Sequence, residues 1–217
     1  MSQRTDRCLA GLHALADDAP HWKLDPVEQA RAACAGGAAV VQLRAKRATD
    51  RIALTWAAEI RRATRETGTL FFVNDRFDLA LAAEADGVHL GQDDLPPARL
   101  PDAARRALLI GRSTHSQGQA RIAVGEPIDY VAFGPLFGTR SKETPFDARG
   151  VAALAAVCEA VAPLPVIAIG GVDVSNAHEA LAAGAAGVAV ISAIAAADDP
   201  VAATRGLVAV LSAATRP

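Results

Sequence analysis

The sequence predicts a single (β/α)8 barrel of the TIM-barrel class over residues 1–217, and three observations lead to this prediction. Eight short apolar runs recur along the chain, at residues 9–16, 38–43, 70–73, 87–90, 108–111, 130–133, 166–169 and 187–190. These runs lack alternating polar residues, as is typical of parallel strands buried on both faces. Ala-rich helical patterns separate them, for instance at residues 25–34, 50–67, 97–107, 151–161 and 176–183.

The ends of the predicted helices carry recognisable signals. Residues 25–28 (DPVE) resemble a capping box with proline in the first turn, and Gly36, Gly68 and Gly184 stand where helix C-termini belong. A doubly wound open sheet is the alternative, but it usually has fewer strands and a glycine-rich dinucleotide turn after the first. Here residues 17–20 (DDAP) follow the first run, so the barrel is favoured.

Composition excludes several classes of partner. The formal charge is −2 and basic clusters are absent, which indicates neither a nucleic acid nor an acidic membrane. Residues 180–197 contain no charged residue, but two glycines divide them, so we expect buried barrel structure rather than a membrane span. A homodimer is compatible with the size of the chain, although no stripe identifies an interface.

Cysteine usage predicts a cytoplasmic protein. The three cysteines are odd in number and lack the spacing of metal ligands, which is typical of buried thiols in a reducing compartment. The apolar stretch at residues 8–16 is interrupted by His13 and followed by two aspartates, so we predict no signal peptide.

Polar residues follow the predicted strands, at the end of the barrel where this fold places its chemistry. After the second run, alternation along an extended backbone places Gln42, Arg44 and Lys46 on one side. Asp75 and Asp94 follow the third and fourth runs, and two carboxylates can hold Mg2+ together with substrate phosphate. The alternatives are a solvated basic turn, and a helix cap at Asp75 with a loop residue at Asp94.

The later strand ends carry hydroxyls and glycines. Ser113 follows the fifth run, where a helix cap is an equally good interpretation. A long loop with Thr139, Ser141 and Lys142 follows the sixth run and suits an anion with several acceptor oxygens, although an ordinary surface loop remains the alternative.

The last two strand ends predict a second anion site. Gly170 and Gly171 follow the seventh run, and Ile191 and Ser192 begin a short helix after the eighth. Loops seven and eight with such a helix form the recurrent phosphate site of this barrel class, although the glycine pair alone could be a tight turn. The mouth is thus expected to bind a metal-associated diphosphate and a monophosphate. No nucleophile–base pair is evident, which favours diphosphate as a leaving group over covalent catalysis.

Six strings in order resemble the thiamine-phosphate synthase family. They are QLRAK, FFVNDRFDLALAAEADGVHLGQDDLP, GRSTHS, DYVAFGPLFGTRSKET, PVIAIGGV and GVAVISAI, and the resemblance runs from about residue 40 to residue 194. The resemblance implies coupling of 4-amino-5-hydroxymethyl-2-methylpyrimidine diphosphate to a thiazole phosphate (4-methyl-5-(2-phosphoethyl)thiazole or its 2-carboxy form). It also implies Mg2+ and a dissociative reaction, in which diphosphate leaves before the thiazole nitrogen captures a pyrimidine methyl cation.

The resemblance also assigns roles. It implies that Gln42, Arg44, Lys46, Asn74, Ser113 and Lys142 contact the pyrimidine diphosphate, that Asp75 and Asp94 bind Mg2+, and that Thr139, Ser141, Gly171, Ile191 and Ser192 bind the thiazole phosphate. Arg44, Lys46 and Lys142 would stabilise the departing charge. Ser141 stands where Thr is commoner and His13 where Tyr is common. For His89 we expect a strand-end side chain satisfied by a neighbour.

Two alternatives stay open. A thiazole tautomerase-like isomerase needs a general base, but such relatives tend to carry His where this chain has Pro135, and to lack the carboxylate of Asp94. A non-catalytic thiazole-phosphate-binding regulator would have lost a carboxylate or Lys142, and none is missing.

Overall fold

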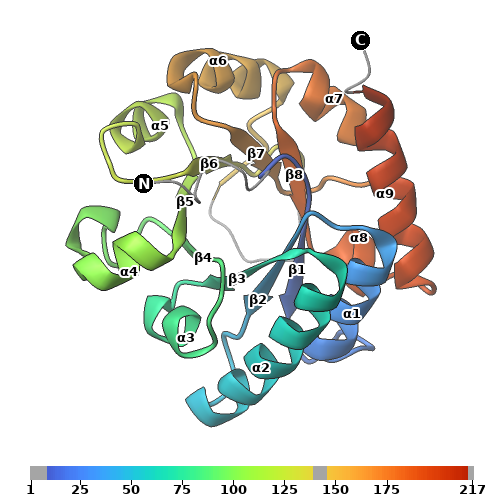
Figure 1. The fold of residues 1–217 in the computed structure, drawn as a ribbon. Coiled ribbons are helices and arrows are strands. Elements are labelled where there is room, and N and C mark those ends of the chain that lie inside the picture. Colours follow the sequence, from blue (N-terminus) through green and yellow to red (C-terminus); the bar gives the residue numbers. More distant parts are fainter. Residues whose placement is uncertain (1–8, 139–145, 215–217) are drawn as a thin grey trace.

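The computed structural model describes residues 9–138 and 146–214, which form a closed barrel of eight parallel strands (Figure 1). Each strand pairs with the next in chain order, and β8 closes the barrel against β1. The strands are β1 (Gly11–Asp17), β2 (Val40–Arg44), β3 (Leu70–Asn74), β4 (Gly87–Leu90), β5 (Leu109–Thr114), β6 (Tyr130–Phe133), β7 (Val166–Ile169) and β8 (Gly187–Val190). The predicted fold class is confirmed.

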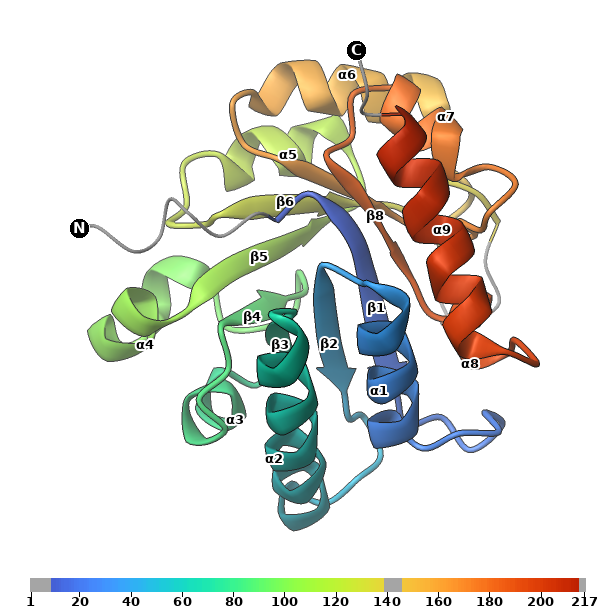
Figure 2. The same cartoon turned by 45° about the vertical axis from the view of Figure 1, so that its right-hand side comes forward.

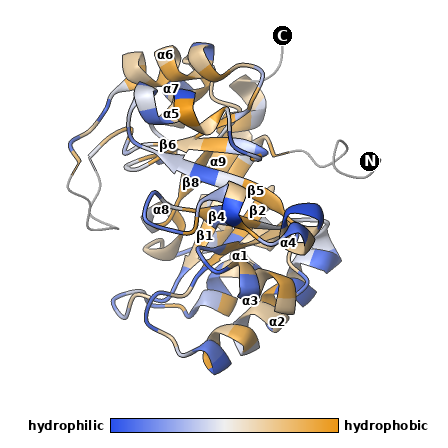
Figure 3. Ribbon diagram, turned by 90° about the vertical axis from the view of Figure 1, so that its left-hand side faces the viewer, coloured by the Kyte–Doolittle hydropathy of each residue, from blue (hydrophilic) through white to orange (hydrophobic). Residues whose placement is uncertain are grey.

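The helices form a ring outside the barrel, as Figures 1 and 2 show from two directions. They are α1 (Pro26–Gly36), α2 (Asp50–Thr67), α3 (Phe77–Ala82), the 3-10 helix η1 (Pro97–Arg99), α4 (Asp102–Ala107), α5 (Gln117–Ala123), α6 (Val151–Val161), α7 (Ala177–Ala182), α8 (Ser192–Ala195) and α9 (Pro200–Ala214). Helix α2 is amphipathic, with mixed colouring in Figure 3. It buries Ala53, Ala57 and Ile60 and exposes Arg51 and Arg65.

The first two strands begin two residues later and end one residue later than predicted. This shift makes Asp17 and Arg44 the last residues of β1 and β2, where they are register partners. Strand β5 runs on to Thr114, so Ser113 lies within the strand. The bounds predicted for β4, β6, β7 and β8 are correct.

The prediction of one continuous helix at residues 97–107 is wrong. Residues 97–107 form two pieces, because η1 ends at Arg99 and α4 begins at Asp102. Pro101 between them has a ψ of 145° and lacks the backbone N–H that a continuous helix would need.

The start of α1 is as predicted, but its end is not. Asp25 and Glu28 form the complete capping box. The left-handed residue that ends the helix is Gly37, with a φ of 90°, whereas Gly36 is still helical. A Cβ at Gly36 would lie 2.3 Å from the Cβ of Thr204, so this glycine allows α1 and α9 to pack closely.

Large aromatic rings fill the barrel interior beneath the strand ends. Phe72 and Tyr130 are buried, and each ring lies over a glycine of a neighbouring strand. A Cβ at Gly87 would lie 2.3 Å from the Phe72 ring, and one at Gly111 would lie 2.2 Å from the Tyr130 ring. The two glycines therefore make room for the rings, as close packing of the interior demands.

The apolar segment at residues 180–197 is divided among the end of α7, strand β8 and helix α8, as predicted. Within the two described ranges, no helix has both the length and the apolar character required to span a membrane. Cys34 is a buried free thiol and Cys158 a half-buried one, and burial raises the pKa of both. Cys8 lies outside the described residues.

Candidate active site

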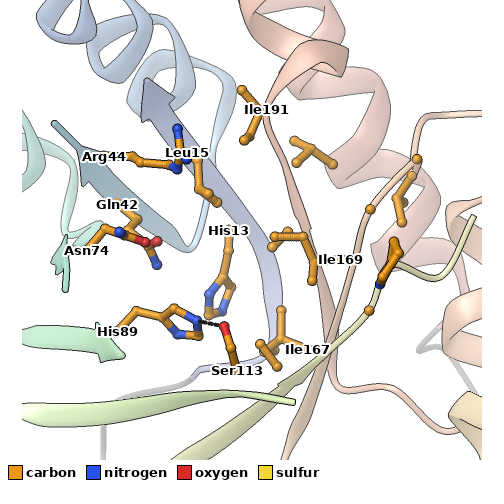
Figure 4. A pocket seen from close by; sticks show the side chains of 18 of the residues that line it. His13, Leu15, Gln42, Arg44, Asn74, His89, Ser113, Ile167, Ile169 and Ile191 are labelled. Carbon is orange, nitrogen blue, oxygen red and sulfur yellow. Dashed lines mark hydrogen bonds between the residues drawn. The ribbon is translucent and has the colours of Figure 1, made fainter. Parts of the chain in front are cut away.

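A cavity opens at the C-terminal ends of the strands, and seven of the predicted site residues line it (Figure 4). They are Gln42, Arg44, Asn74, Ser113, Gly171, Ile191 and Ser192. Three further predicted residues, Lys46, Asp75 and Asp94, form an ionic cluster in the segments that follow strands β2, β3 and β4. Thr139, Ser141 and Lys142 lie outside the described residues.

Arg44 is held in the cavity wall by a buried carboxylate. Its guanidinium donates a hydrogen bond to Asp17, whose side chain is completely buried. Asp17 also accepts hydrogen bonds from Trp22 Nε1 at 2.7 Å and from the backbone N–H of Ala19 at 3.0 Å. The Gln29 side chain bonds both the N–H and the C=O of Asp17 at 2.9 Å. Sequence reasoning missed Asp17, although its place at the end of a predicted strand was available as a signal.

The ionic cluster brings together the predicted carboxylates. Lys46 forms an ion pair with Asp75, and Asp94 accepts a hydrogen bond from the backbone N–H of Gly91 at 2.6 Å. Burial, followed by a hydrogen bond with Asp75, raises the pKa of the Asp94 carboxyl. The alternative that Asp75 caps a helix is wrong, because Arg76 occupies the N-cap of α3 and makes no side-chain cap bond.

The cluster fits a small hard cation that completes its shell with non-protein oxygens. Two adjacent carboxylates concentrate negative charge, and Asp75 is held in the left-handed region with a φ of 64°. Across residues 9–138 and 146–214, no group of three or more His, Cys, Asp or Glu side chains is arranged to hold a metal. Mg2+ commonly accepts one or two protein carboxylates together with water and phosphate oxygens.

Ser113 points into the cavity from β5 and contacts His89 of β4 (Figure 4). His89 Nε2 lies 2.8 Å from Ser113 Oγ, and its Nδ1 lies 2.8 Å from the hydroxyl of Tyr130. The cap interpretation of Ser113 is wrong, since Ser116 caps α5 by accepting from Gln119 N at 3.2 Å. The expectation that neighbours satisfy His89 is confirmed. Ser113 and His89 therefore lie in hydrogen-bonding contact, but the residue on the other side of the imidazole is a phenol, whereas a Ser–His–Asp relay has a carboxylate there.

The opposite side of the cavity is built from backbone. Gly170 and Gly171 have φ values of 96° and 68°, which side chains rarely adopt. A Cβ at Gly171 would lie 2.4 Å from the carbonyl oxygen of Gly138. Ile191 occupies the N-cap of α8, and Ser192 begins that helix. This side therefore offers backbone groups, one hydroxyl and no charged side chain among the described lining residues.

Comparison with known proteins shows which family the chain belongs to. A family model described as thiamine monophosphate synthase matches residues 12–194. The chain belongs to the thiamine monophosphate synthase family. A thiamine-phosphate synthase of Methanoculleus marisnigri is 48% identical over 178 residues, covering 82% of this chain and 84% of the relative. One of Anaeromyxobacter dehalogenans is 45% identical over 214 residues, covering 94% and 89%.

The fold of the chain also resembles that of a solved structure. Thiamine phosphate pyrophosphorylase from Pyrococcus furiosus superimposes with a TM-score of 0.86 at 36% identity, covering 97% of this chain and 99% of that one. Membership of the thiamine monophosphate synthase family makes the chain an enzyme of the transferase class, as the sequence resemblance implies.

Two histidines, His13 and His115, line the cavity although the sequence predicted no role for them there. His13 is buried, and burial lowers its pKa to about 4 in spite of a 2.8 Å hydrogen bond to the carbonyl of Leu9. The ring is therefore neutral near pH 7. His115 Nδ1 lies 2.6 Å from the carbonyl oxygen of Gly134, and its ring stacks on Phe146 at 4.3 Å.

Proposed function

We propose that this chain couples 4-amino-5-hydroxymethyl-2-methylpyrimidine diphosphate to 4-methyl-5-(2-phosphoethyl)thiazole, or its 2-carboxy form, with Mg2+. The products are thiamine monophosphate and diphosphate, and the 2-carboxy form would in addition lose its carboxyl group as carbon dioxide. The observation that carries the proposal is one cavity with two unlike sides. Arg44, Gln42 and Asn74 line one side, with the Lys46–Asp75–Asp94 cluster in the segments that follow their strands, and backbone after β7 and β8 lines the other.

The charged side suits the diphosphate. Arg44 lines the cavity, and Lys46 lies beside the carboxylate pair. Asp75 and Asp94 would hold Mg2+, which when bound neutralises charge on the diphosphate as it departs. Gln42, Asn74 and Ser113 supply neutral hydrogen-bonding groups on the same side, and Lys142 completes the set by family resemblance. Preorganised cations of this kind stabilise a leaving group without any covalent bond to the protein.

The backbone side suits the thiazole phosphate. Gly171, which is in the left-handed conformation, and Ser192, which begins the first turn of α8, both line the cavity and would turn peptide N–H groups toward a phosphate. Such peptide N–H groups bind phosphate in many barrels of this class. Thr139 and Ser141 are assigned to the same phosphate by resemblance.

A dissociative reaction agrees with the residues that surround the cavity. The C–O bond breaks and its electron pair leaves with diphosphate, after which the thiazole nitrogen forms a bond to the methylene carbon. Neither Cys34 nor Cys158 lines the cavity. Ser113 contacts His89, and His89 Nδ1 meets the hydroxyl of Tyr130, at the place where a nucleophilic serine–histidine relay has a carboxylate.

The test measures thiamine monophosphate and released diphosphate with both substrates, first with Mg2+ and then with EDTA. We expect product only when both substrates and the metal are present. Binding of the thiazole phosphate without turnover would favour a regulator instead. Conversion of the thiazole phosphate alone into an isomer would favour a tautomerase, against which Pro135 and the second carboxylate Asp94 argue.

A further inference from the structure

We propose that Tyr130 is a positioning residue that fixes the tautomer of His89 and thereby makes the Ser113 hydroxyl a hydrogen-bond donor toward the substrate. The proposal rests on the proposed function, in which Ser113 contacts the pyrimidine diphosphate. All three residues line the cavity, and their side chains form one chain of hydrogen bonds from the buried Tyr130 hydroxyl to Ser113.

The first step is the proton of the Tyr130 hydroxyl. Tyr130 is 1% exposed, and His89 Nδ1 at 2.8 Å is the hydrogen-bond partner of its hydroxyl within the described ranges. A buried hydroxyl without an acceptor is costly, so the phenol donates its proton to Nδ1. Burial also raises the pKa of Tyr130, which keeps the phenol protonated.

The second step follows from the two nitrogens of the imidazole, of which Nδ1 carries no proton because it accepts from the phenol. One nitrogen accepts and the other carries a proton, so acceptance at Nδ1 places the proton on Nε2. His89 Nε2 then donates to Ser113 Oγ at 2.8 Å. A histidine in this state cannot remove the proton of Ser113, which separates the arrangement from a nucleophilic serine–histidine pair.

The third step concerns the remaining proton of Ser113. Its oxygen already accepts from His89, so the O–H is left to donate, and Ser113 lines the cavity. A donor is what an oxygen of a diphosphate requires, and hydrogen bonds to ionised acceptors are among the stronger ones. The opposite tautomer would engage this proton with Nε2 and leave only lone pairs facing the ligand.

The stacked geometry supports a fixed relay. The rings of His89 and Tyr130 lie 5.5 Å apart with an interplanar angle of 27°, and Tyr130 also contacts Phe72 edge-on at 5.9 Å. Packing therefore holds the phenol in place, and Tyr130→Phe removes the O–H while preserving the ring.

The first measurement is the tautomer itself, by 15N–1H correlation spectroscopy of the histidine rings in the full-length protein without substrates. A His89→Gln spectrum assigns the His89 signals. We expect a protonated Nε2 in the unsubstituted protein, and a rise in the Nδ1-protonated form in Tyr130→Phe. A protonated Nδ1 in the unsubstituted protein would overturn the proposal whatever the enzyme does.

The second measurement is a double-mutant cycle on the KM of the pyrimidine diphosphate. Tyr130→Phe should raise this KM about tenfold, as expected for losing one charge-assisted hydrogen bond. In a Ser113→Ala background, Tyr130→Phe should change the KM of the pyrimidine diphosphate by less than about twofold. The KM of the thiazole phosphate should stay the same when Tyr130→Phe is introduced into either background. An equal rise in KM with and without Ser113 would overturn the proposal.

Thr114→Val provides the matched control. Thr114 is the next residue of β5, is buried, does not line the cavity, and donates to the carbonyl of Ala132 at 3.0 Å. Losing this hydroxyl should lower the melting temperature without moving either KM. If Ser113→Ala leaves the diphosphate KM unchanged, the Ser113 contact of the proposed function fails and the donor role falls with it, while the spectroscopy still decides the tautomer.

Discussion

The two sides of the cavity would offer an anion different groups. One side is lined by Arg44, which is paired with buried Asp17, and the ionic cluster of Lys46, Asp75 and Asp94 lies in the segments that follow β2 to β4. The side formed after β7 and β8 carries no charged side chain among the described lining residues and relies on the backbone around Gly171. Figure 4 shows Arg44, Gln42 and Asn74 facing Ile169 and Ile191 across the cavity.

This difference shows which kind of change each side tolerates. On the charged side, removing one member leaves its partner uncompensated, and the cost is large when that partner is buried. On the backbone side, a hydroxyl contributes little, but an added Cβ displaces the chain. We therefore expect charge changes to affect the diphosphate and steric changes to affect the thiazole phosphate.

The largest effect is expected from Asp94→Ala. This substitution removes one of two carboxylates for Mg2+, so turnover should fall by at least about 100-fold while the fold is retained. Steady-state assays across Mg2+ concentrations measure it. Asp93→Ala is the matched control, because Asp93 is the exposed neighbour in the same loop and should change little. Activity of Asp94→Ala at the normal level would remove the metal assignment.

Asp17→Asn should raise the KM of the pyrimidine diphosphate by about tenfold or more. The amide cannot neutralise Arg44, so the guanidinium loses the charged partner that holds it in the cavity wall. Asp86→Asn is the control, since Asp86 forms a comparably buried pair with Arg61 at 2.7 Å and lies outside the cavity lining. It should lower stability without changing either KM. Identical kinetic effects of both substitutions would mean that Asp17 acts only through stability.

Gly171→Ala should raise the KM of the thiazole phosphate about tenfold and leave that of the diphosphate nearly unchanged. The new Cβ would lie 2.4 Å from the Gly138 carbonyl oxygen and 2.8 Å from the Phe137 Cβ, so the loop must move. Gly150→Ala is the control that distinguishes backbone strain from a steric clash. Gly150 also has a positive φ, of 78°, but an added Cβ would meet no atom within 4 Å. Both variants should lose about 1–3 kcal/mol of stability from the backbone conformation, and only Gly171→Ala should affect binding.

The smallest effect is expected from Ser192→Ala. Backbone N–H groups would carry most of the phosphate contact, so the KM of the thiazole phosphate should change by less than about threefold. Isothermal titration with the thiazole phosphate provides a second measure. A loss of binding here would show that the hydroxyl is essential and that the two sides are less different than proposed.

Local sequence patterns were enough for the barrel and for most of the mouth. The apolar runs predicted all eight strands because a parallel strand buried on both faces has no room for polar alternation. The capping box at Asp25 and Glu28 was predictable because it depends on residues three apart. The strand ends also identified seven of the residues that line the cavity, since the C-terminal ends of parallel strands in a closed barrel meet at one face.

Other features depend on residues distant in the chain. Asp17 holds Arg44 only because the register of β1 and β2 places them side by side, 27 positions apart in sequence. Gly36 appeared to be a helix stop, but its role is to admit α9, which comes at the end of the chain. The sequence around Asp17 does not indicate its contact with Arg44, and the sequence around Gly36 does not indicate its contact with α9.

The sequence by itself determined the barrel and the residue types at its mouth, because burial and backbone conformation act on residues near each other in the chain. Only the tertiary structure decided how those residues are partnered. The bonds from Tyr130 through His89 to Ser113 cross three strands, and whether a hydroxyl donates or accepts depends on the last partner in that series. The donor and acceptor roles of one group depend on every other group in the network. They can therefore be assigned only when the positions of all three side chains are known.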